Sequence, residues 1–288
     1  MKNAFRFLLG CCVLAASTLF ISSCAQQDND ETAALVEENT PAEEVYNPGD
    51  EITTRTDCDG TNVHWEYTGA EGTDHWDDLC DAWACGGNRQ SPINIVPPAT
   101  RTFARSLNFY YDDSELEIVN NGHTIQFNYD GGSHLKVNGT KYNLLQFHFH
   151  AGSEHTVKGV QYPAEIHFVH QNTTTGKLSV IGVFVEEGDE NDFLADVLEH
   201  FPHHEGEYTS TDHYNATSLL PDSWNKWGKH FWYYDGSLTT PPCSEIVNWF
   251  VMEDKIEASH EQLEELAEIL HGNYRPVQPL NTRLVRAQ

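Results

Sequence analysis

Short runs in which apolar and polar residues alternate make up most of the chain after residue 57. In the run "NGHTIQFNY", the apolar residues Ile125, Phe127 and Tyr129 fall two apart, so they share one face of a β-strand. The run "KLSVIGVFVE" at 177–186 is almost continuously apolar, which is typical of a strand in the middle of a sheet. The pattern predicts a chain built mainly of strands.

Turn and helix signals separate these strands. Asn138 and Gly139 stand between two strand-like runs, and this dipeptide is a strong local signal for a β-hairpin. One helix is predicted late in the chain, where Ser259 and Gln262 form a capping box ahead of regularly spaced leucines. The fold class is therefore predicted to be mainly β.

The first 24 residues are predicted to be a secretory signal. Lys2 and Arg6 precede an apolar run that ends in "ISSC" at Cys24, and the run is too short for a membrane span. "ISSC" also resembles the lipobox of bacterial lipoproteins, whose cysteine becomes the acylated first residue. The alternatives are an ordinary signal peptide cut nearby and an uncleaved anchor. We expect an exported protein, lipid-anchored through Cys24 in the periplasm or on the outer surface of a bacterium.

Residues 25–57 carry ten Asp or Glu against one Arg. Such a stretch cannot bury enough apolar surface to fold, so it is predicted to be a disordered acidic tether. The whole chain has a formal net charge of −28. This negative balance argues against nucleic acid as a partner.

Four cysteines follow the signal segment: Cys58, Cys80, Cys85 and Cys243. An even number in an exported chain indicates disulfides, and four cysteines allow three pairings. No CxxC pair or Cys–His cluster in the sequence indicates a thiolate metal site.

The run "LLQFHFH" places two histidines on one face of a predicted strand. Gln146, His148 and His150 share that face, and aromatic residues occupy the other. Two imidazoles and an amide need polar partners or a metal ion when they are buried. A polar strand face with satisfied histidines is the alternative, because the chain has sixteen histidines.

The run "AEIHFVH" can supply a third ligand, because Glu165, His167 and Val169 share one face. Glycines and a proline in the linking segment allow the two strands to return antiparallel. Three neutral imidazoles without a fourth protein ligand describe a catalytic zinc site with an open position. Gln146 and Glu165 each stand two residues before a ligand, where they can bond its outer nitrogen.

The segment from about Val63 to Arg286 resembles the alpha-class carbonic anhydrases. Seven stretches carry the resemblance, in this order: "HWEYTG", "CGGNRQSPINI", "NNGHTIQF", "QFHFHAGSEHTV", "PAEIHFVH", "YYDGSLTTPPCSE" and "NYRPVQPLNTR". The resemblance implies one catalytic domain over 58–288. Its fold would be a large, mostly antiparallel twisted central sheet with short peripheral helices.

The resemblance implies a role for each matching residue. His148, His150 and His167 match the zinc ligands. A zinc ion held by three neutral imidazoles lowers the pKa of its bound water to about 7. The resulting zinc-bound hydroxide attacks carbon dioxide and gives bicarbonate. Thr239 matches the hydroxyl that accepts the hydroxide's hydrogen bond, and Glu154 matches the carboxylate that orients Thr239.

The resemblance also implies the surroundings of the metal. The substrate pocket would consist of Val169, Val180, Leu238, Thr240 and Trp249.

His123 matches the proton shuttle, and a histidine with a pKa near neutrality suits a relay through water. Tyr67, Asn121 and Gln126 match the residues that order the connecting waters.

Cys85 and Cys243 match the disulfide of exported members, which leaves Cys58 and Cys80 to pair by elimination. Pro92 and Pro242 match positions of cis peptide bonds.

Two features depart from the family pattern. Ala151 stands where many members have tryptophan, and the segment 200–215, "HFPHHEGEYTSTDHYN", is unusually rich in histidine and acidic residues. No function follows for that segment, and a solvated loop is the expectation.

The function predicted is zinc-dependent interconversion of carbon dioxide and bicarbonate, with membrane contact only through the lipid anchor. Two alternatives are a non-catalytic binding module on the same fold and a surface zinc-binding lipoprotein. A binding module could lack zinc histidines, but all three are present here. A zinc-binding lipoprotein would not need Glu154, Thr239 or an apolar pocket, and the sequence has these as well.

Overall fold

The computed structural model describes residues 57–58, 61–98, 100–101, 105–225 and 229–288, with side chains from Val63 onward. The predicted signal peptide, Cys24 and almost all of the predicted tether lie outside the described residues. These three stay predictions. In the described part of the chain, no helix is long and apolar enough to cross a membrane.

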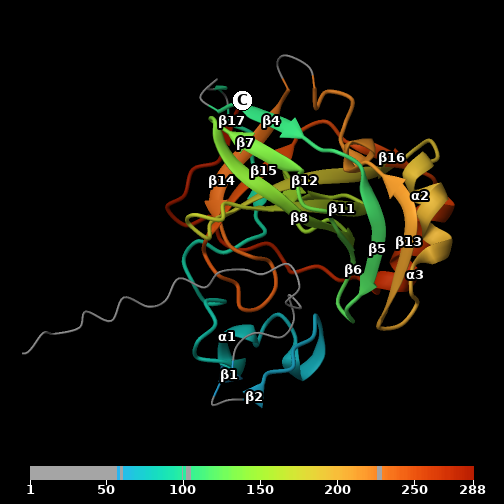
Figure 1. Cartoon of the computed structure of the whole chain (residues 1–288). Coiled ribbons are helices and arrows are strands. Elements are labelled where there is room, and N and C mark those ends of the chain that lie inside the picture. Colours follow the sequence, from blue (N-terminus) through green and yellow to red (C-terminus); the bar gives the residue numbers. More distant parts are fainter. Residues whose placement is uncertain (1–56, 59–60, 99, 102–104, 226–228) are drawn as a thin grey trace, which may run out of the picture. The chain divides into compact units, whose positions relative to one another are not determined.

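A sheet of twelve strands forms the centre of the described chain (Figure 1). Its main path runs in the order β13 (Gly206–Tyr214), β5 (Ser114–Asn120), β6 (Ile125–Asn128), β8 (Thr140–Ala151), β11 (Ala164–Gln171), β12 (Leu178–Glu187), β15 (Val247–Met252), β14 (Phe231–Gly236) and β17 (Arg286–Ala287). Beside this path pair β4 (Leu107–Tyr110), β7 (His134–Val137) and β16 (Ile256–Ala258). The predicted mainly β, mostly antiparallel sheet is confirmed. The sheet is nevertheless mixed, because β12 runs parallel to β15 and β16.

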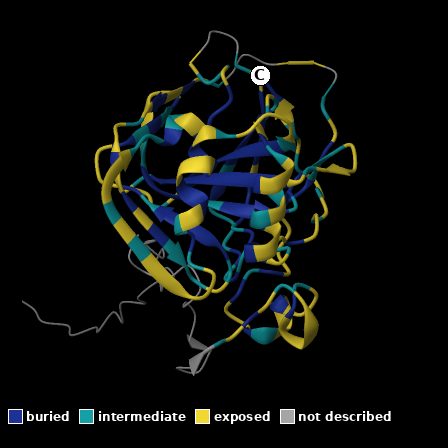
Figure 2. Cartoon of the chain, turned by 90° about the vertical axis from the view of Figure 1, so that its right-hand side faces the viewer, coloured by how far each residue is buried: buried dark blue, intermediate teal, exposed yellow. Residues whose placement is uncertain are grey.

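Short elements complete the described fold. Two small sheets are formed by β1 (Asp57–Cys58) with β2 (Thr61–Asn62), and by β3 (Asn94–Ile95) with β9 (Thr156–Val157) and β10 (Val160–Gln161). The α-helices are α1 (Trp76–Leu79), α2 (Asp192–Val197) and α3 (His260–Leu270), and 3₁₀ turns cover Gly69–Glu71, Leu198–His200 and Ala216–Leu219. Figure 2 shows that the central strands are buried, whereas the helices keep one side exposed.

Apolar side chains pack on both faces of the central strands. On one face, the fully buried rings of Phe127 and Phe147 stack with their centroids 4.6 Å apart. Helices α2 and α3 add Phe193 and Leu266 to the same cluster. A separate cluster contains Trp249 and other residues of β12, β14 and β15. Each buried aromatic or aliphatic side chain contributes about 1.5–3 kcal/mol through removal of apolar surface from water.

The local signals of the sequence are present where they were predicted. Asn138 and Gly139 connect β7 to β8 with φ angles of 49° and 85°, the left-handed conformations that a tight two-residue hairpin requires. At the start of α3, the Ser259 side chain accepts a hydrogen bond from the Gln262 backbone, and the capping box is complete.

The antiparallel pairing of β8 with β11 sets the geometry of the polar face. His148 lies opposite His167, and His150 lies opposite Glu165. Residues directly opposite each other in such a pair share one face of the sheet. The predicted antiparallel return is therefore confirmed, and it gathers three imidazoles on one face.

Candidate metal centre

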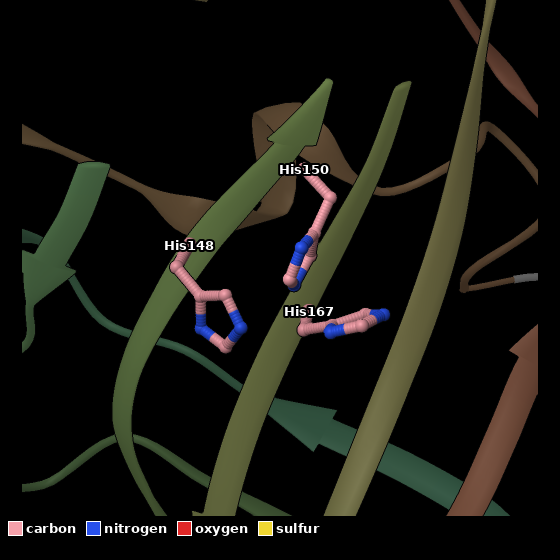
Figure 3. Close-up of side chains that lie close together, drawn as sticks. All are labelled: His148, His150 and His167. Atoms are coloured by element: carbon pink, nitrogen blue, oxygen red, sulfur yellow. The ribbon is translucent and has the colours of Figure 1, made fainter. Parts of the chain in front are cut away.

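Three imidazoles from two neighbouring strands converge on one point (Figure 3). One ring nitrogen from each of His148, His150 and His167 lies within 4.8 Å of the others. The ring centroids are 5.1 Å apart for His148 and His150, and 4.6 Å apart for His150 and His167. The same strand face that the sequence pattern indicated thus presents three nitrogen atoms to one small volume.

The outer nitrogen of each imidazole contacts a hydrogen-bond acceptor. His148 Nδ1 donates to Gln146 Oε1 over 2.8 Å, and His167 Nε2 donates to Glu165 Oε1 over 3.0 Å. His150 Nδ1 donates to the backbone carbonyl of Asn273 over 2.6 Å. Because these partners are acceptors, each outer nitrogen carries the proton and each inner nitrogen carries a lone pair.

Burial favours the uncharged form of His148 and His150. Desolvation, followed by the charges of the neighbouring imidazoles, lowers the pKa of His148 well below its ordinary value. Desolvation also lowers the pKa of His150, whose Nε2 is buried without a hydrogen-bond partner. Three neutral imidazoles with inward lone pairs are the donor set of a catalytic zinc site. The residues present therefore fit a zinc ion.

Asn273 was missed by the sequence analysis as a partner of the site. Its backbone carbonyl holds His150, and its side chain accepts from the Ala151 backbone and donates to the carbonyls of His123 and Phe149. Any residue can supply a backbone carbonyl, so no residue type in the sequence could have indicated this contact.

Glu165 is the centre of a second buried group. The backbone N–H and Nδ1 of His155 both donate to its carboxylate, and His155 Nε2 lies 2.6 Å from the hydroxyl of Tyr234. Burial raises the pKa of Glu165, but the electrostatic attraction of the imidazoles of His155 and His167 and the hydrogen bonds that they donate outweigh it and hold the pKa well below its ordinary value. Glu165 is thus a fixed, ionised acceptor for His167.

Glu154 lies beside the imidazoles. Its Oε1 accepts from the backbone N–H of Arg275 over 2.9 Å. Its Oε2 accepts no hydrogen bond and lies 3.6 Å from His150 Nε2 and 3.8 Å from His167 Nδ1. Thr239 and Glu154, both in the described part of the chain, make no direct hydrogen bond with each other, and the roles that the resemblance gives them stay predictions.

A cavity opens over the three imidazoles. All five predicted pocket residues line it: Val169, Val180, Leu238, Thr240 and Trp249. Thr239, Tyr67, Asn121, Gln146 and His123 line it as well.

Gln126 does not belong to the lining of this cavity. It lies on β6, and its amide donates to Asn128 Oδ1 over 2.6 Å. It lies opposite His148 on the face of the imidazoles, and its Oε1 is buried without a hydrogen-bond partner, so its part in ordering water stays a prediction.

His123 sits in the turn before β6 at the mouth of the cavity. Asn121 Oδ1 accepts from the backbone N–H groups of His123 and Thr124 and holds the turn. The His123 ring stacks on Trp65, with centroids 3.8 Å apart and planes 12° apart. Burial, and secondarily the charge of His64, lowers the pKa of His123 to about 4. This value is lower than the near-neutral pKa expected for a relay, because Trp65 covers the ring.

A disulfide between Cys85 and Cys243 ties down the loop that carries Thr239. In that loop, the Cys243 backbone donates to the Thr240 carbonyl over 2.8 Å. Cys80 is disulfide-bonded as well. The side chain of its predicted partner, Cys58, lies outside the described residues, so that pairing stays a prediction.

Both cis peptide bonds implied by the resemblance are present, before Pro92 and before Pro242.

Comparison with known proteins agrees with this geometry. The sequence model of the eukaryotic-type carbonic anhydrase family matches residues 71–288. A carbonic anhydrase from Nostoc sp. is 40% identical over 231 residues, which cover 77% of this chain and 85% of that protein. One from Neisseria gonorrhoeae is 38% identical over 232 residues, covering 78% of this chain and 88% of that protein.

Solved structures of carbonic anhydrases are also similar to this chain. A hyperthermostable carbonic anhydrase from a hydrothermal vent chimney superposes with a TM-score of 0.72 at 41% identity, covering 78% of this chain and 100% of that chain. The alpha-carbonic anhydrase of Thermovibrio ammonificans, solved with the inhibitor sulfanilamide, gives a TM-score of 0.71 at 40% identity, with 78% and 100% covered. The chain belongs to the eukaryotic-type, or alpha, carbonic anhydrase family, whose members hydrate carbon dioxide. It is thus an enzyme rather than a stand-alone binding module.

Proposed function

We propose that the chain catalyses the reversible hydration of carbon dioxide to bicarbonate and a proton, with zinc held by His148, His150 and His167. The observation that carries the proposal is the convergence of three imidazoles whose outer nitrogens each donate to a fixed acceptor. A zinc ion bound there supplies a water molecule with a pKa of about 7, and so an oxygen nucleophile at neutral pH. Gln146, Glu165 and the Asn273 carbonyl keep the imidazoles in the ligating tautomer.

The sheet register supports an apolar wall for carbon dioxide beside the metal ligands. Val169 on β11 lies opposite Val180 on β12, and Val180 lies level with Trp249 on the parallel strand β15. These three side chains form a row across the sheet, and Leu238 lines the same cavity. An apolar molecule gains free energy by leaving water for such a wall. We assign this row the binding of the substrate.

We assign Thr239 and Glu154 the orientation of the nucleophile. Glu154 Oε2 is buried with an unused acceptor position, and Thr239 lines the cavity that the imidazoles face. A hydroxyl that donates to a carboxylate can accept a hydrogen bond only through its oxygen. Thr239 would therefore select a nucleophile that presents a proton to it and a lone pair to the substrate.

Proton removal is assigned to His123. Tyr67 and Asn121 line the cavity between the metal ligands and this ring, and the Tyr67 hydroxyl is buried without a hydrogen-bond partner in the structure. Such a group can bind a water molecule on the path.

The export signal and a lipid anchor at Cys24 remain part of the proposal. They are supported by the basic start, the apolar run and the "ISSC" stretch. Metabolic labelling with a fatty acid should label the wild type and not Cys24→Ala. A wild type without label would exclude the lipid anchor.

The test of the proposed activity is a stopped-flow measurement of carbon dioxide hydration with a metal analysis. The purified full chain should hold about one zinc per molecule, as a single three-histidine site implies, and should accelerate hydration. His148→Ala should lose both properties. A wild type that binds zinc without accelerating hydration would instead favour the zinc-binding lipoprotein.

A further inference from the structure

Three hollows follow one another from the metal ligands to a group of exposed histidines, His203, His204 and His271, which we call the rim. The catalytic cavity shares Tyr67 and His123 with a second hollow, the inner groove. The inner groove shares Gly122 and His271 with a third, the outer groove. The outer groove is also lined by His203, His204 and Glu205. The hollows thus connect His123 to the histidine-rich segment that the proposed function leaves without a role.

The fold fixes this segment against the turn that carries His123. The side chain of Asn120 donates to the Pro202 carbonyl over 2.7 Å, and Gly206 pairs with Asn120 where β13 begins. Gly122 has a φ of 83°, and the Glu205 carboxylate packs so closely on it that a Cβ there would lie 2.9 Å from Oε1. His203 and His204, just before Glu205, are thereby held beside the mouth of the cavity.

His271 stands between the two grooves because of the way α3 ends. It adopts the left-handed conformation with a φ of 52°, and its backbone N–H donates to the Ala267 carbonyl. The chain turns there and continues to Asn273, whose amide donates to the His123 carbonyl. His271 and His123 both line the inner groove.

We propose that His271, His203 and His204 form a second proton relay that takes the product proton onward from His123 to buffer in solution. This inference rests on the proposed hydration activity. The transfer changes only N–H and O–H bonds. Each water or imidazole accepts one proton from the cavity side and releases one toward the solvent, so nothing is oxidised or reduced.

The charges around the grooves suit this role. The charged and titratable groups that line the two grooves with His271 are Glu66, Tyr67, His123, His203, His204 and Glu205. The two carboxylates attract a migrating proton. Imidazole is the side chain whose ordinary titration falls between pH 5 and 8, whereas burial lowers the pKa of His123 to about 4. The exposed imidazoles of His203, His204 and His271 can take up a proton that leaves His123 and release it to solvent.

A metal site at the rim is less well supported. In the part of the chain that the structure describes, ligand atoms cluster closely enough for a metal ion only at the candidate centre and in the adjoining group of His155, Glu165 and His167. A metal site needs ligand atoms that meet at one point. A proton relay does not, because water in the grooves can bridge the gaps between imidazoles.

The test compares hydration by the zinc-loaded full chain at low and high buffer concentration. In the triple variant His203→Gln, His204→Gln, His271→Gln, kcat at low buffer should fall at least about threefold, a modest part of the 10²-fold or more that a positioned proton-transfer group contributes. The value of kcat/KM should be unchanged, and concentrated imidazole buffer should restore kcat. An unchanged kcat at low buffer, or an equal fall in kcat/KM, would overturn the relay.

The matched control removes three histidines that do not line either groove, His213, His230 and His260. This triple Gln variant should keep the wild-type buffer dependence. If it lost kcat at low buffer as strongly as the rim variant, the effect would come from overall histidine content and the relay would be wrong.

A second measurement does not depend on the activity. A relay group must take up and release a proton, so the ring resonances of His203, His204 and His271, assigned by single Gln variants, should move with pH in proton NMR of the zinc-free full chain. Ring resonances that do not move with pH would overturn the relay. A wild type without hydration activity would refute the proposed function, whereas an active enzyme sensitive to His123→Ala but not to the rim variant would refute the relay alone.

Discussion

His148 on β8 lies directly opposite His167 on β11, with ring centroids 5.3 Å apart. The backbone ladder between the two strands therefore fixes the distance between two of the three imidazoles that we propose as metal ligands. Because side chains alternate along a strand, a slip of one residue would turn His148 to the opposite face. The register of this strand pair is thus a condition for metal binding.

The amide of Gln146 should matter for metal affinity. In Gln146→Ala, His148 Nδ1 loses the acceptor that now lies 2.8 Å away, so the ring can rotate and change tautomer. Loss of such a partner weakens metal binding about 10–100-fold. Competition with a chromophoric zinc chelator measures the change. Lys141→Ala, at an exposed position on the same strand, is the control and should bind zinc like the wild type. Equal affinities for both variants would contradict the assignment.

The packing of Phe147 beneath the imidazoles should affect the stability of the fold more than it affects the affinity for metal. Phe147 is fully buried and stacks on Phe127, on the face opposite the imidazoles. Phe147→Ala should lower the free energy of unfolding by about 3–5 kcal/mol, the usual cost of such a cavity. Phe147→Leu should cost less because it leaves a smaller cavity. Urea unfolding measures both. A loss below about 1 kcal/mol in the Ala variant would mean that the core closes around the cavity.

The disulfide beside Thr239 should stabilise both the fold and the loop. Its cysteines are 158 residues apart, so the cross-link constrains a large part of the unfolded chain. Removing it in the double variant Cys85→Ser, Cys243→Ser should lower the free energy of unfolding by about 2–5 kcal/mol. The value of kcat should also fall, because the loop that presents Thr239 loses its anchor. Unfolding curves and hydration rates identical to those of the wild type would contradict this role.

His170 should make stability fall with acidity. It is buried, its Nε2 lies 2.6 Å from the Tyr111 hydroxyl, and burial lowers its pKa to about 4. The unfolded chain binds the proton near the ordinary pKa of about 6.5. Between these values only the unfolded state is charged, so stability rises with pH and is reduced by about 3 kcal/mol when the pH falls to about 4.

The check on His170 is urea unfolding of the zinc-free protein between pH 4 and 7. His170→Gln removes the titrating group, so its free energy of unfolding should vary less with pH than that of the wild type by about that amount. Parallel pH profiles for the two proteins would show that His170 does not carry this dependence.

The strand periodicity explains why much of the site could be predicted. Two imidazoles two residues apart must share a face, and a third on the neighbouring strand reaches them only if the pairing is antiparallel. The same reasoning gave Gln146 and Glu165 as neighbours of His148 and His167. These inferences needed no contact between distant parts of the chain beyond one strand pair.

The features that the sequence did not indicate all depend on distant segments. The Asn273 carbonyl reaches His150 from 123 residues away, and Trp65 covers His123 from an N-terminal segment. Loop placement of this kind follows from the packed fold rather than from residue type or spacing.

The most direct test of the central claim is X-ray absorption of the zinc-loaded full chain. The account predicts three imidazole nitrogens at about 2.0–2.1 Å and one further light atom from solvent. It also predicts that one imidazole is lost in His167→Ala. A zinc ion bound by fewer than three imidazoles, or with the Glu154 carboxylate in the fourth position, would contradict it.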